Sequence, residues 1–127
     1  MKENFFIITN NPKVYDKLKD HHQIHYQEGD YMRVLKSARD YVYAGHALLT
    51  HPLAGSVKPN ETPYKSIMIA NDKQKLDFQS VEIIDSSIRT CEKFSSNIRT
   101  YQQEVFQDFQ HIDYSLIENA IASAIAW

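Results

Sequence analysis

The sequence predicts an α/β fold with three layers, Rossmann-like, in which a mostly parallel sheet of about four strands is followed by long C-terminal helices. Two observations predict it. Short apolar runs and amphipathic stretches alternate in the order strand, helix, strand, helix, strand, which is typical of open sheets with right-handed crossovers. All 3 glycines and all 4 prolines lie at or before Pro63, so the rest of the chain favours uninterrupted helices. The 127 residues fit a single domain, 1–127.

The first strand is expected over residues 4–9. Phe5 to Ile8 is apolar on both faces, as in a strand from the centre of a sheet. Asn11 is a good N-cap and Pro12 a good first residue for the short helix that follows, because proline has no N–H to lose there. Alternation of apolar and polar side chains over 22–27 then predicts an edge strand.

A second helix is expected to begin after Asp30, which can cap it, and to end at Gly45. Its apolar residues recur at helical spacing, so one face packs on the core. Two further apolar strands are predicted, Ala47 to Thr50 and Ser66 to Ala70. The direction of the second of these is left open, because no crossover helix is visible in the connection before it.

From about Asp77 to Val105 the apolar residues recur at steps of three and four, which predicts a narrow helical seam of about thirty residues and about 45 Å. Residues 95–97, Ser-Ser-Asn, are its weakest point. A last helix is expected to begin near Ser115, which forms a capping box with Glu118. A helix of about 45 Å is longer than a domain of this size can cover. We therefore expect part of the 77–105 seam to pack on a second subunit in a homodimer. The seam consists of Val81, Ile84, Ile88, Cys91, Phe94, Ile98, Tyr101 and Val105.

The charge and cysteine content exclude several classes of function. A net charge of −2 and a pI near 6.3 argue against a nucleic-acid partner. The apolar run from Phe5 to Ile8 is too short for a signal peptide or a membrane span, so no membrane partner is expected. The single cysteine, Cys91, cannot form an intramolecular disulfide and is interpreted as a core residue. We therefore expect a cytoplasmic protein.

No cofactor and no metal is predicted. The segment Gly55 to Lys58 lacks the paired glycines of a phosphate loop and is followed by Pro59 instead of a helix. The three glycines are too widely separated for a dinucleotide-binding fingerprint. His21, His22 and His25 fall on an alternating strand that divides them between two faces, so a solvated edge is the better interpretation.

The segment from His51 to Pro63 is the strongest candidate for function. Three prolines and a glycine exclude a regular helix, and a structureless connection this long is usually either functional or disordered. It follows an apolar strand, so it leaves the sheet at an edge where α/β proteins bind ligands. The Lys58 ammonium, hydroxyls and free backbone N–H groups there suit a carboxylate or phosphate. The alternative is a proline-braced connection that only covers the sheet edge. The predicted ligand-binding residues are Asn10, Asn11, Thr50, His51, Gly55, Ser56, Lys58 and Asn60.

Three further residues are assigned a supporting role. Arg39 lies near the end of the second predicted helix, where a cation complements the helix dipole. Asp40 either orients a histidine or pairs with a lysine. His46 opens the next predicted strand and is more typical of a hydrogen-bonded framework residue than of a catalyst. No catalytic residue is predicted.

The sequence resembles the GrdX family, small proteins encoded beside the glycine, sarcosine and betaine reductase genes of anaerobic bacteria. The resemblance lies mainly in residues 39–70, with the N-terminal strand and its Asn-Asn-Pro turn. It implies a cytoplasmic accessory or regulator of a reductase complex, and it carries over no catalytic residue. The residues that carry it are Arg39-Asp40, Gly45-His46, Leu48 to Leu53, Gly55 to Asn60 and Pro63-Tyr64.

Three functions follow, in order of preference. The first is an accessory or regulatory protein of the glycine and betaine reductase system that binds a small anionic ligand at the 50–64 loop. The alternative is a protein-interaction subunit or assembly factor for the reductase, with no small ligand. The least favoured is a small acid/base enzyme that uses His51 or His46, since no residue pair reaches the specificity of a catalytic motif. On balance we do not expect an enzyme.

Overall fold

The structure, a computed structural model, describes residues 4–54, 62–93 and 103–125. Within these ranges it contains a small mixed sheet and a long C-terminal helix. In the first half of the chain the strands and helices follow the expected order, except that residues 47–50 form no strand. The elements are β1 (Phe5–Thr9), α1 (Pro12–Leu18), β2 (Ile24–Tyr26), α2 (Tyr31–Tyr43), β3 (Ser66–Ala70), α3 (Phe78–Lys93) and α4 (Gln103–Ile125).

The sheet has three strands in the order β2-β1-β3. β1 pairs with β2 in parallel, with Ile7 opposite Ile24, and with β3 in antiparallel fashion, with Ile7 opposite Met68. The central position predicted for β1 is confirmed, since all five of its residues are buried. The predicted mostly parallel, four-stranded, Rossmann-like sheet is wrong: the sheet is mixed and has one strand fewer.

The predicted strand Ala47 to Thr50 forms only an isolated bridge, in which Leu48 lies opposite Ile69 on β3. The ladder ends because the N–H of Met68 donates to the side-chain hydroxyl of Thr50, at 3.0 Å, instead of to a backbone carbonyl. Such side-chain bonds compete with regular pairing. The apolar character of residues 47–50, from which the strand was predicted, gives no sign of this competition.

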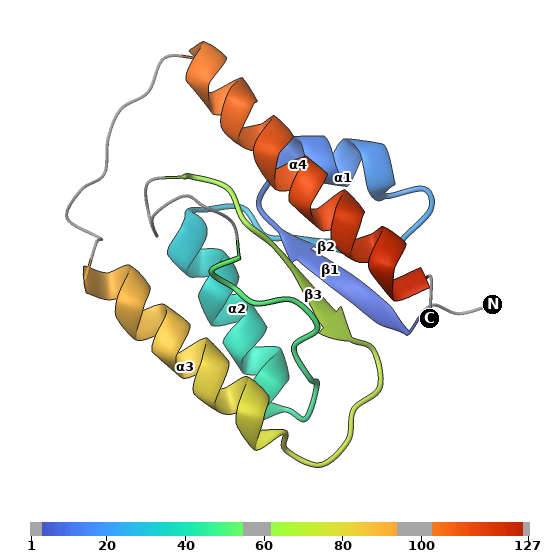
Figure 1. The fold of residues 1–127 in the computed structure, drawn as a ribbon, viewed down its shortest axis with the longest axis vertical. Helices are drawn as coiled ribbons and strands as arrows, with labels where there is room; N and C mark the ends of the chain where they lie inside the picture. The colour runs from blue at the N-terminus through green and yellow to red at the C-terminus, as the bar shows by residue number, and fades with distance from the viewer. Residues whose placement is uncertain (1–3, 55–61, 94–102, 126–127) are drawn as a thin grey trace.

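Helices cover both faces of the sheet, so the three-layer part of the prediction is correct. The side chains of Phe6 and Ile8 point to one face, where they pack with α2 and α3. Those of Phe5 and Ile7 point to the other face, where they pack with α1 and α4. Figure 1 shows the two helix pairs on opposite sides of the sheet. Each face of β1 therefore has its own hydrophobic core, as its continuous apolar run requires.

The helix termini in the first half follow the sequence signals. The Asn11 side chain accepts a hydrogen bond from the N–H of Lys13 at 3.0 Å, and Pro12 is the first residue of α1. The Asp30 side chain accepts from the N–H of Arg33 at 2.9 Å and so caps α2. After α2 the chain turns at Gly45, whose φ is +112°.

The C-terminal half differs from the sequence interpretation. α3 ends at Lys93 after 16 residues, and α4 begins at Gln103; residues 94–102, which include the suspected weak point 95–97, lie outside the described ranges. Because the predicted thirty-residue seam includes residues 94–102, its full length lies outside the described residues, and the homodimer argued from that length stays a prediction. Ser115 does not begin a helix but lies inside α4. The predicted capping box is absent: the Glu118 carboxylate accepts a hydrogen bond from the Tyr114 hydroxyl, at 2.6 Å, within the same helix.

Two further findings concern the helices. Cys91 is buried on α3 and burial raises the pKa of its thiol to about 11, as expected of a core cysteine. No helix within the described ranges is long and apolar enough to cross a bilayer.

Gly45→Ala is expected to destabilise the protein by about 3 kcal/mol or more, because a Cβ at this position combines an unfavourable positive φ with a clash against the carbonyl oxygen of Gln74. Gly29→Ala is the matched control. Its φ is also positive, +131°, but its Cβ would meet only the flexible side chain of Arg33, at 3.1 Å. In urea unfolding, the Gly29→Ala control should lose less free energy of unfolding than Gly45→Ala, about 1–2 kcal/mol. Equal losses for the two variants would contradict the close approach at Gly45.

Candidate functional site

The candidate site lies at the sheet edge where β1 ends at Thr9 and β3 begins at Ser66, which we call the loop edge. The 47–50 segment also runs toward this edge, because it is antiparallel to β3. Just after this segment, the backbone carbonyl of Pro52 accepts a hydrogen bond of 2.9 Å from the hydroxyl of Tyr31, which is the first residue of α2. The loop edge therefore collects the end of β1, the start of β3 and both described ends of the proline-rich connection.

A buried carboxylate on α4 organises the loop edge. Ser66 donates its N–H to Asp113 Oδ1 at 3.0 Å and its hydroxyl to Asp113 Oδ2 at 2.7 Å. The Asn11 side-chain amide donates to the same Oδ2 at 3.0 Å. Thr9 completes the arrangement, because its hydroxyl lies 2.7 Å from that of Ser66 and accepts the N–H of Asn11 at 3.0 Å. We call these four residues the Asp113 network; none of them is more than 5% exposed.

The network joins elements that are distant in the sequence. Thr9 and Asn11 lie at the end of β1 and the start of α1, Ser66 begins β3, and Asp113 comes from the middle of α4. Since every donor and acceptor in it is directional, the network fixes the position of α4 along the sheet, which apolar packing alone does less precisely.

Burial also sets the electrostatics of this edge. It raises the pKa of Asp113 above the usual carboxyl value, although the hydrogen bonds from Asn11 and Ser66 and the charge of Lys65 oppose the shift. Burial likewise lowers the pKa of Lys65, against the attraction of Asp113. Each charge therefore offsets part of the desolvation cost of the other.

Asn10 and Lys65 hold the two described ends of the 55–61 connection. Asn10 donates through Nδ2 to the carbonyl of Pro63 at 2.8 Å and to that of Gly29 at 2.9 Å, and its Oδ1 accepts the N–H of Lys65 at 2.9 Å. The Lys65 ammonium donates to the carbonyl of Ala54 at 3.0 Å. Both residues are buried, with exposed fractions of 4% and 5%.

Asn10 and Asn11, predicted as ligand-binding residues, have no side-chain N–H left for an anionic ligand in this arrangement. Both donors and the acceptor of the Asn10 amide are used by the backbone. Asn11 donates to Asp113 and to the carbonyl of Gln110, at 2.9 Å, and accepts from Lys13. Their role in the structure is to position the loop edge.

The remaining predicted ligand-binding residues divide into two groups. The Thr50 hydroxyl is bonded to Met68, and His51 is exposed, with its Nδ1 accepting the N–H of Leu53 at 3.1 Å. Four others fall in 55–61 and so lie outside the described residues: Gly55, Ser56, Lys58 and Asn60.

The supporting residues lie toward the opposite edge of the sheet, away from the loop. His46 donates through Nδ1 to the carbonyl of Ala70, the last residue of β3, at 2.8 Å, and its ring meets that of Phe6 edge-on. This is the framework role predicted for it. Arg39 is half-buried and Asp40 exposed, both near the end of α2.

The N-terminal histidines do not form a metal centre. Among the described residues, no group of three or more His, Cys, Asp or Glu is placed to hold a metal ion. His25 stacks on Phe6 with ring centroids 4.5 Å apart, and its Nδ1 lies 3.0 Å from the Tyr41 hydroxyl. Burial lowers its pKa, as expected for a histidine packed on an aromatic ring.

Sequence reasoning missed Asp113 and Lys65, which are central to the loop edge. A signal for Asp113 was present: it precedes Ile117 and Ile121 at steps of four, so it shares the apolar face of α4. A carboxylate in such a position needs partners that satisfy it. For Lys65 no comparable signal exists, because its burial depends on how the connection returns to the sheet.

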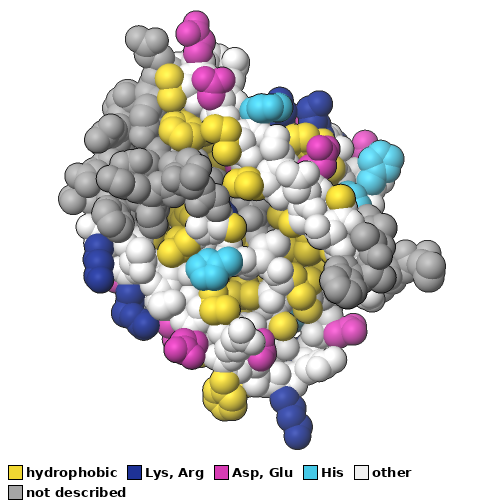
Figure 2. Space-filling model, viewed as in Figure 1, with side chains coloured by type: hydrophobic (Ala, Val, Ile, Leu, Met, Phe, Trp, Pro, Cys, Tyr) yellow, Lys and Arg dark blue, Asp and Glu magenta, His cyan; other side chains and the backbone are white. Residues whose placement is uncertain are grey.

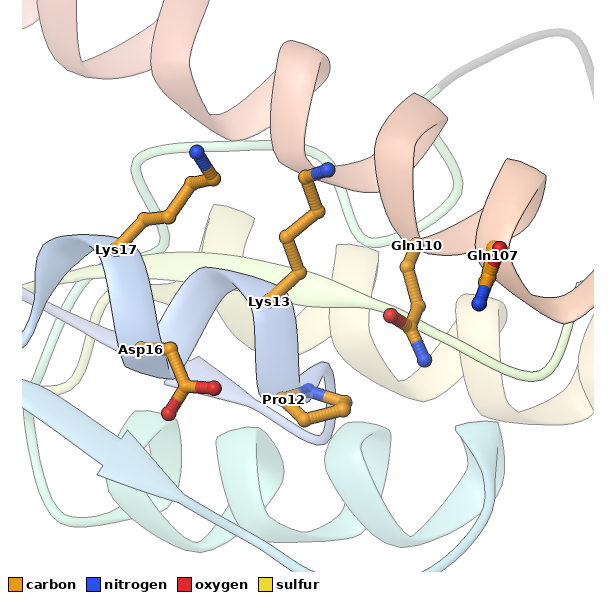
Figure 3. Close-up of a pocket in the computed structure, with 6 residues that line it drawn as sticks. All are labelled: Pro12, Lys13, Asp16, Lys17, Gln107 and Gln110. Carbon is orange, nitrogen blue, oxygen red and sulfur yellow. The ribbon is translucent and has the colours of Figure 1, made fainter.

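Three surface hollows adjoin the described elements. One of 390 Å³ lies between α1 and α4 and is shown in Figure 3. A more apolar one of 480 Å³ lies between Leu49 and the end of α4. The third, of 620 Å³, is at the edge opposite the loop, beside Gly45.

The comparisons with known proteins establish the family. A family model described as GrdX-like protein matches residues 6–122, all of the chain except a few residues at each end. The chain therefore belongs to the GrdX-like family, as the resemblance indicated. No curated protein and no solved structure matches it significantly.

Asp113→Ala is expected to lower the free energy of unfolding by about 2–4 kcal/mol, because it leaves the buried donors of Ser66 and Asn11 without an acceptor. Asp108→Ala, an exposed carboxylate on the same helix, is the control and should change it by no more than about 0.5 kcal/mol. Denaturant unfolding measures both. If Asp113→Ala lowered the free energy of unfolding no more than Asp108→Ala does, the stabilising role of the Asp113 network would be contradicted.

The pKa of Asp113 also predicts a pH dependence. Its folded-state pKa lies above its ordinary value of 3.8, so in the window above that value the folded state binds more protons than the unfolded state. Stability relative to Asp113→Asn should therefore fall as the pH rises from 4 toward the raised pKa, by about 1.4 kcal/mol for each unit of the shift. Unfolding measured from pH 4 to 7 tests this. A wild-type protein that gains stability over Asp113→Asn across that window would show that the folded-state pKa is lowered instead.

Proposed function

We propose that this protein binds a small anionic ligand through its 50–64 loop, and that it serves as an accessory or regulatory protein of the glycine and betaine reductase system. One observation carries the ligand-binding part. Asn10 and Lys65, both buried, bond to Ala54 on one side of the 55–61 segment and to Pro63 on the other. A connection that merely covered the edge would not need buried polar side chains at both ends.

The physical advantage of this arrangement is preorganisation. Closing a loop and ordering its side chains reduce the free energy available for binding. When the ends are already fixed by buried hydrogen bonds, a ligand orders fewer residues. The loop edge also lies where the chain leaves an apolar strand, which is a common position for binding sites in α/β folds.

The chemistry of the ligand follows from the residues of the segment itself. We assign contact with the anion to Lys58, Ser56 and the backbone N–H groups around Gly55, since an ammonium, a hydroxyl and amides together suit a carboxylate or phosphate. Asn10 is assigned to positioning this segment and Asn11 to the Asp113 network, because their amides are already bonded to the protein.

The link to the reductase system rests on the family. Membership of the GrdX-like family suggests an association with glycine reductase. The gene neighbourhood implied by the resemblance supports an accessory or regulatory role over an independent one.

A protein-interaction role is the second candidate. Leu49, Ile112 and Leu116 are 48%, 45% and 40% exposed, and Leu49 lines the apolar hollow beside α4. The face of the molecule drawn in Figure 2 carries hydrophobic side chains across its middle, with most charged ones toward its rim. Exposed apolar surface of this kind suits a protein partner such as a reductase component.

An acid/base enzyme is the least supported function. His46 is bonded to the Ala70 carbonyl and packed against rings, while His51 accepts a local backbone N–H near the loop edge. The two histidines belong to different ends of the 46–51 segment, and neither has a carboxylate hydrogen-bonded to it among the described residues. A catalytic pair would need that geometry.

Lys58→Ala is expected to abolish ligand-induced thermal stabilisation. The purified protein is screened against glycine, sarcosine, betaine, acetyl phosphate and inorganic phosphate. A ligand at a hundred times its Kd should add about 2.7 kcal/mol, a shift of several degrees in Tm. Lys73→Ala, which removes an exposed lysine at the opposite edge, should retain the full shift.

The controls separate the candidates. Asn10→Ala should weaken the stabilisation as well, because it releases Pro63 and Lys65 without removing charge. If no compound stabilises the protein, or if the stabilisation survives Lys58→Ala, the loop is not a ligand site. Binding of a purified reductase component that is lost on Leu116→Asp would then favour the interaction role.

A further inference from the structure

We propose that the cleft between α1 and α4 is a second binding site, which takes a small molecule with a dianionic head group, such as a phosphate monoester or a dicarboxylate. This inference goes beyond the proposed function, because its residues come from two helices and not from the 50–64 loop. The cleft has a volume of 390 Å³. It is lined by Pro12, Lys13, Asp16, Lys17, Gln107 and Gln110.

Two uncompensated cations face the cleft. Lys13 and Lys17 are one helical turn apart on α1, and like charges at this spacing destabilise a helix slightly. Neither ammonium forms an ion pair with a carboxylate of the described chain; Lys17 lies over the Tyr114 ring, 5.8 Å from its centroid. A bound dianion would supply the missing counter-charge to both.

The opposite wall offers neutral hydrogen-bonding groups in place of acidic ones. α4 carries Glu104 and Asp108 on nearby turns, but the residues that line the cleft from α4 are Gln107 and Gln110. In Figure 3 both lysine chains rise from α1 toward α4, and Gln110 and then Gln107 lie beside Lys13, on the side away from Lys17. A carboxylate on that wall would neutralise the lysines, whereas an amide can donate to the oxygens of an anion.

Asp16, the one carboxylate lining the cleft, does not neutralise the lysines. Figure 3 shows its side chain directed away from both ammonium groups. The lining groups therefore carry a net charge of about +1, with the positive charge gathered on the side that faces α4.

The glutamine wall is held in place by the loop edge. The Gln110 carbonyl accepts the Asn11 amide at 2.9 Å, and its side-chain amide donates to the Tyr64 hydroxyl at 2.9 Å. Gln110 keeps its side-chain oxygen and one N–H for a ligand. A volume of 390 Å³ greatly exceeds that of a single bound anion and falls at the small end of ligand pockets. The cleft therefore leaves room for a small organic body beside an anionic head group.

The test is an NMR titration of the ¹⁵N-labelled protein with glycerol 3-phosphate and, separately, with succinate. These two probes distinguish a phosphate from a dicarboxylate head. Saturable shifts are expected at the side-chain amides of Gln107 and Gln110, and Lys13→Ala should weaken binding at least tenfold. Lys36→Ala, which removes an exposed lysine from α2 on the other face of the sheet, should leave the affinity within twofold.

The proposed site in the α1–α4 cleft and the proposed ligand site in the 50–64 loop can be tested independently of each other. Lys58→Ala should leave the titration of the cleft unchanged, and Lys13→Ala should leave any ligand of the loop unaffected. Three results would overturn the cleft site: no saturable shift with either dianion, equal weakening by Lys36→Ala, or full binding to Lys13→Ala. Thermal unfolding of each lysine variant confirms that it is folded before titration.

Discussion

The burial of Asp113 is the constraint on which the rest of the structure depends. A carboxylate that is only 5% exposed must be satisfied, and it is satisfied by the backbone and hydroxyl of Ser66 and by the amide of Asn11. These partners begin β3 and α1, so the requirement of one side chain on α4 sets how both helices of this face meet the sheet. Apolar contacts such as that of Ile117 add stability but tolerate small displacements, whereas hydrogen bonds do not.

The same interaction places the parts that we connect with function. Ser66 follows Lys65, which with Asn10 holds the two described ends of the 55–61 segment. Asn11 bonds to Gln110, which lines the cleft between α1 and α4. The proposed ligand loop and the proposed dianion cleft are therefore separate surfaces built on one buried scaffold. This arrangement is consistent with the accessory, ligand-responsive role that we propose for this member of the GrdX-like family.

Local signals in the sequence predicted what local physics decides. The continuous apolar run of β1 placed it at the centre, and Asn11 and Asp30 cap the helices they precede. Signals that depend on tertiary partners failed. Thr50 ended the predicted strand 47–50 by taking the Met68 N–H with its hydroxyl. The direction of β3, which the sequence left open, is antiparallel to β1. For the site, the long proline-rich segment 51–63 pointed to the loop edge. Asn10 and Asn11, predicted as ligand-binding residues there, position the edge, and the buried charges of Lys65 and Asp113 were missed. The ligand-contact residues assigned to 55–61 remain predictions.

Hydrogen exchange at two backbone amides tests the central claim most directly. The N–H of Lys65 donates to the Asn10 side chain and the N–H of Ser66 to Asp113, so their protection reports the buried polar contacts and not a β-ladder. If these contacts organise the fold, both amides should exchange only through global unfolding, with the same opening free energy as the central residues of β1. Exchange of Lys65 and Ser66 that is several kcal/mol easier than at Ile7 would contradict the account, since it would show that the edge opens while the sheet stays intact.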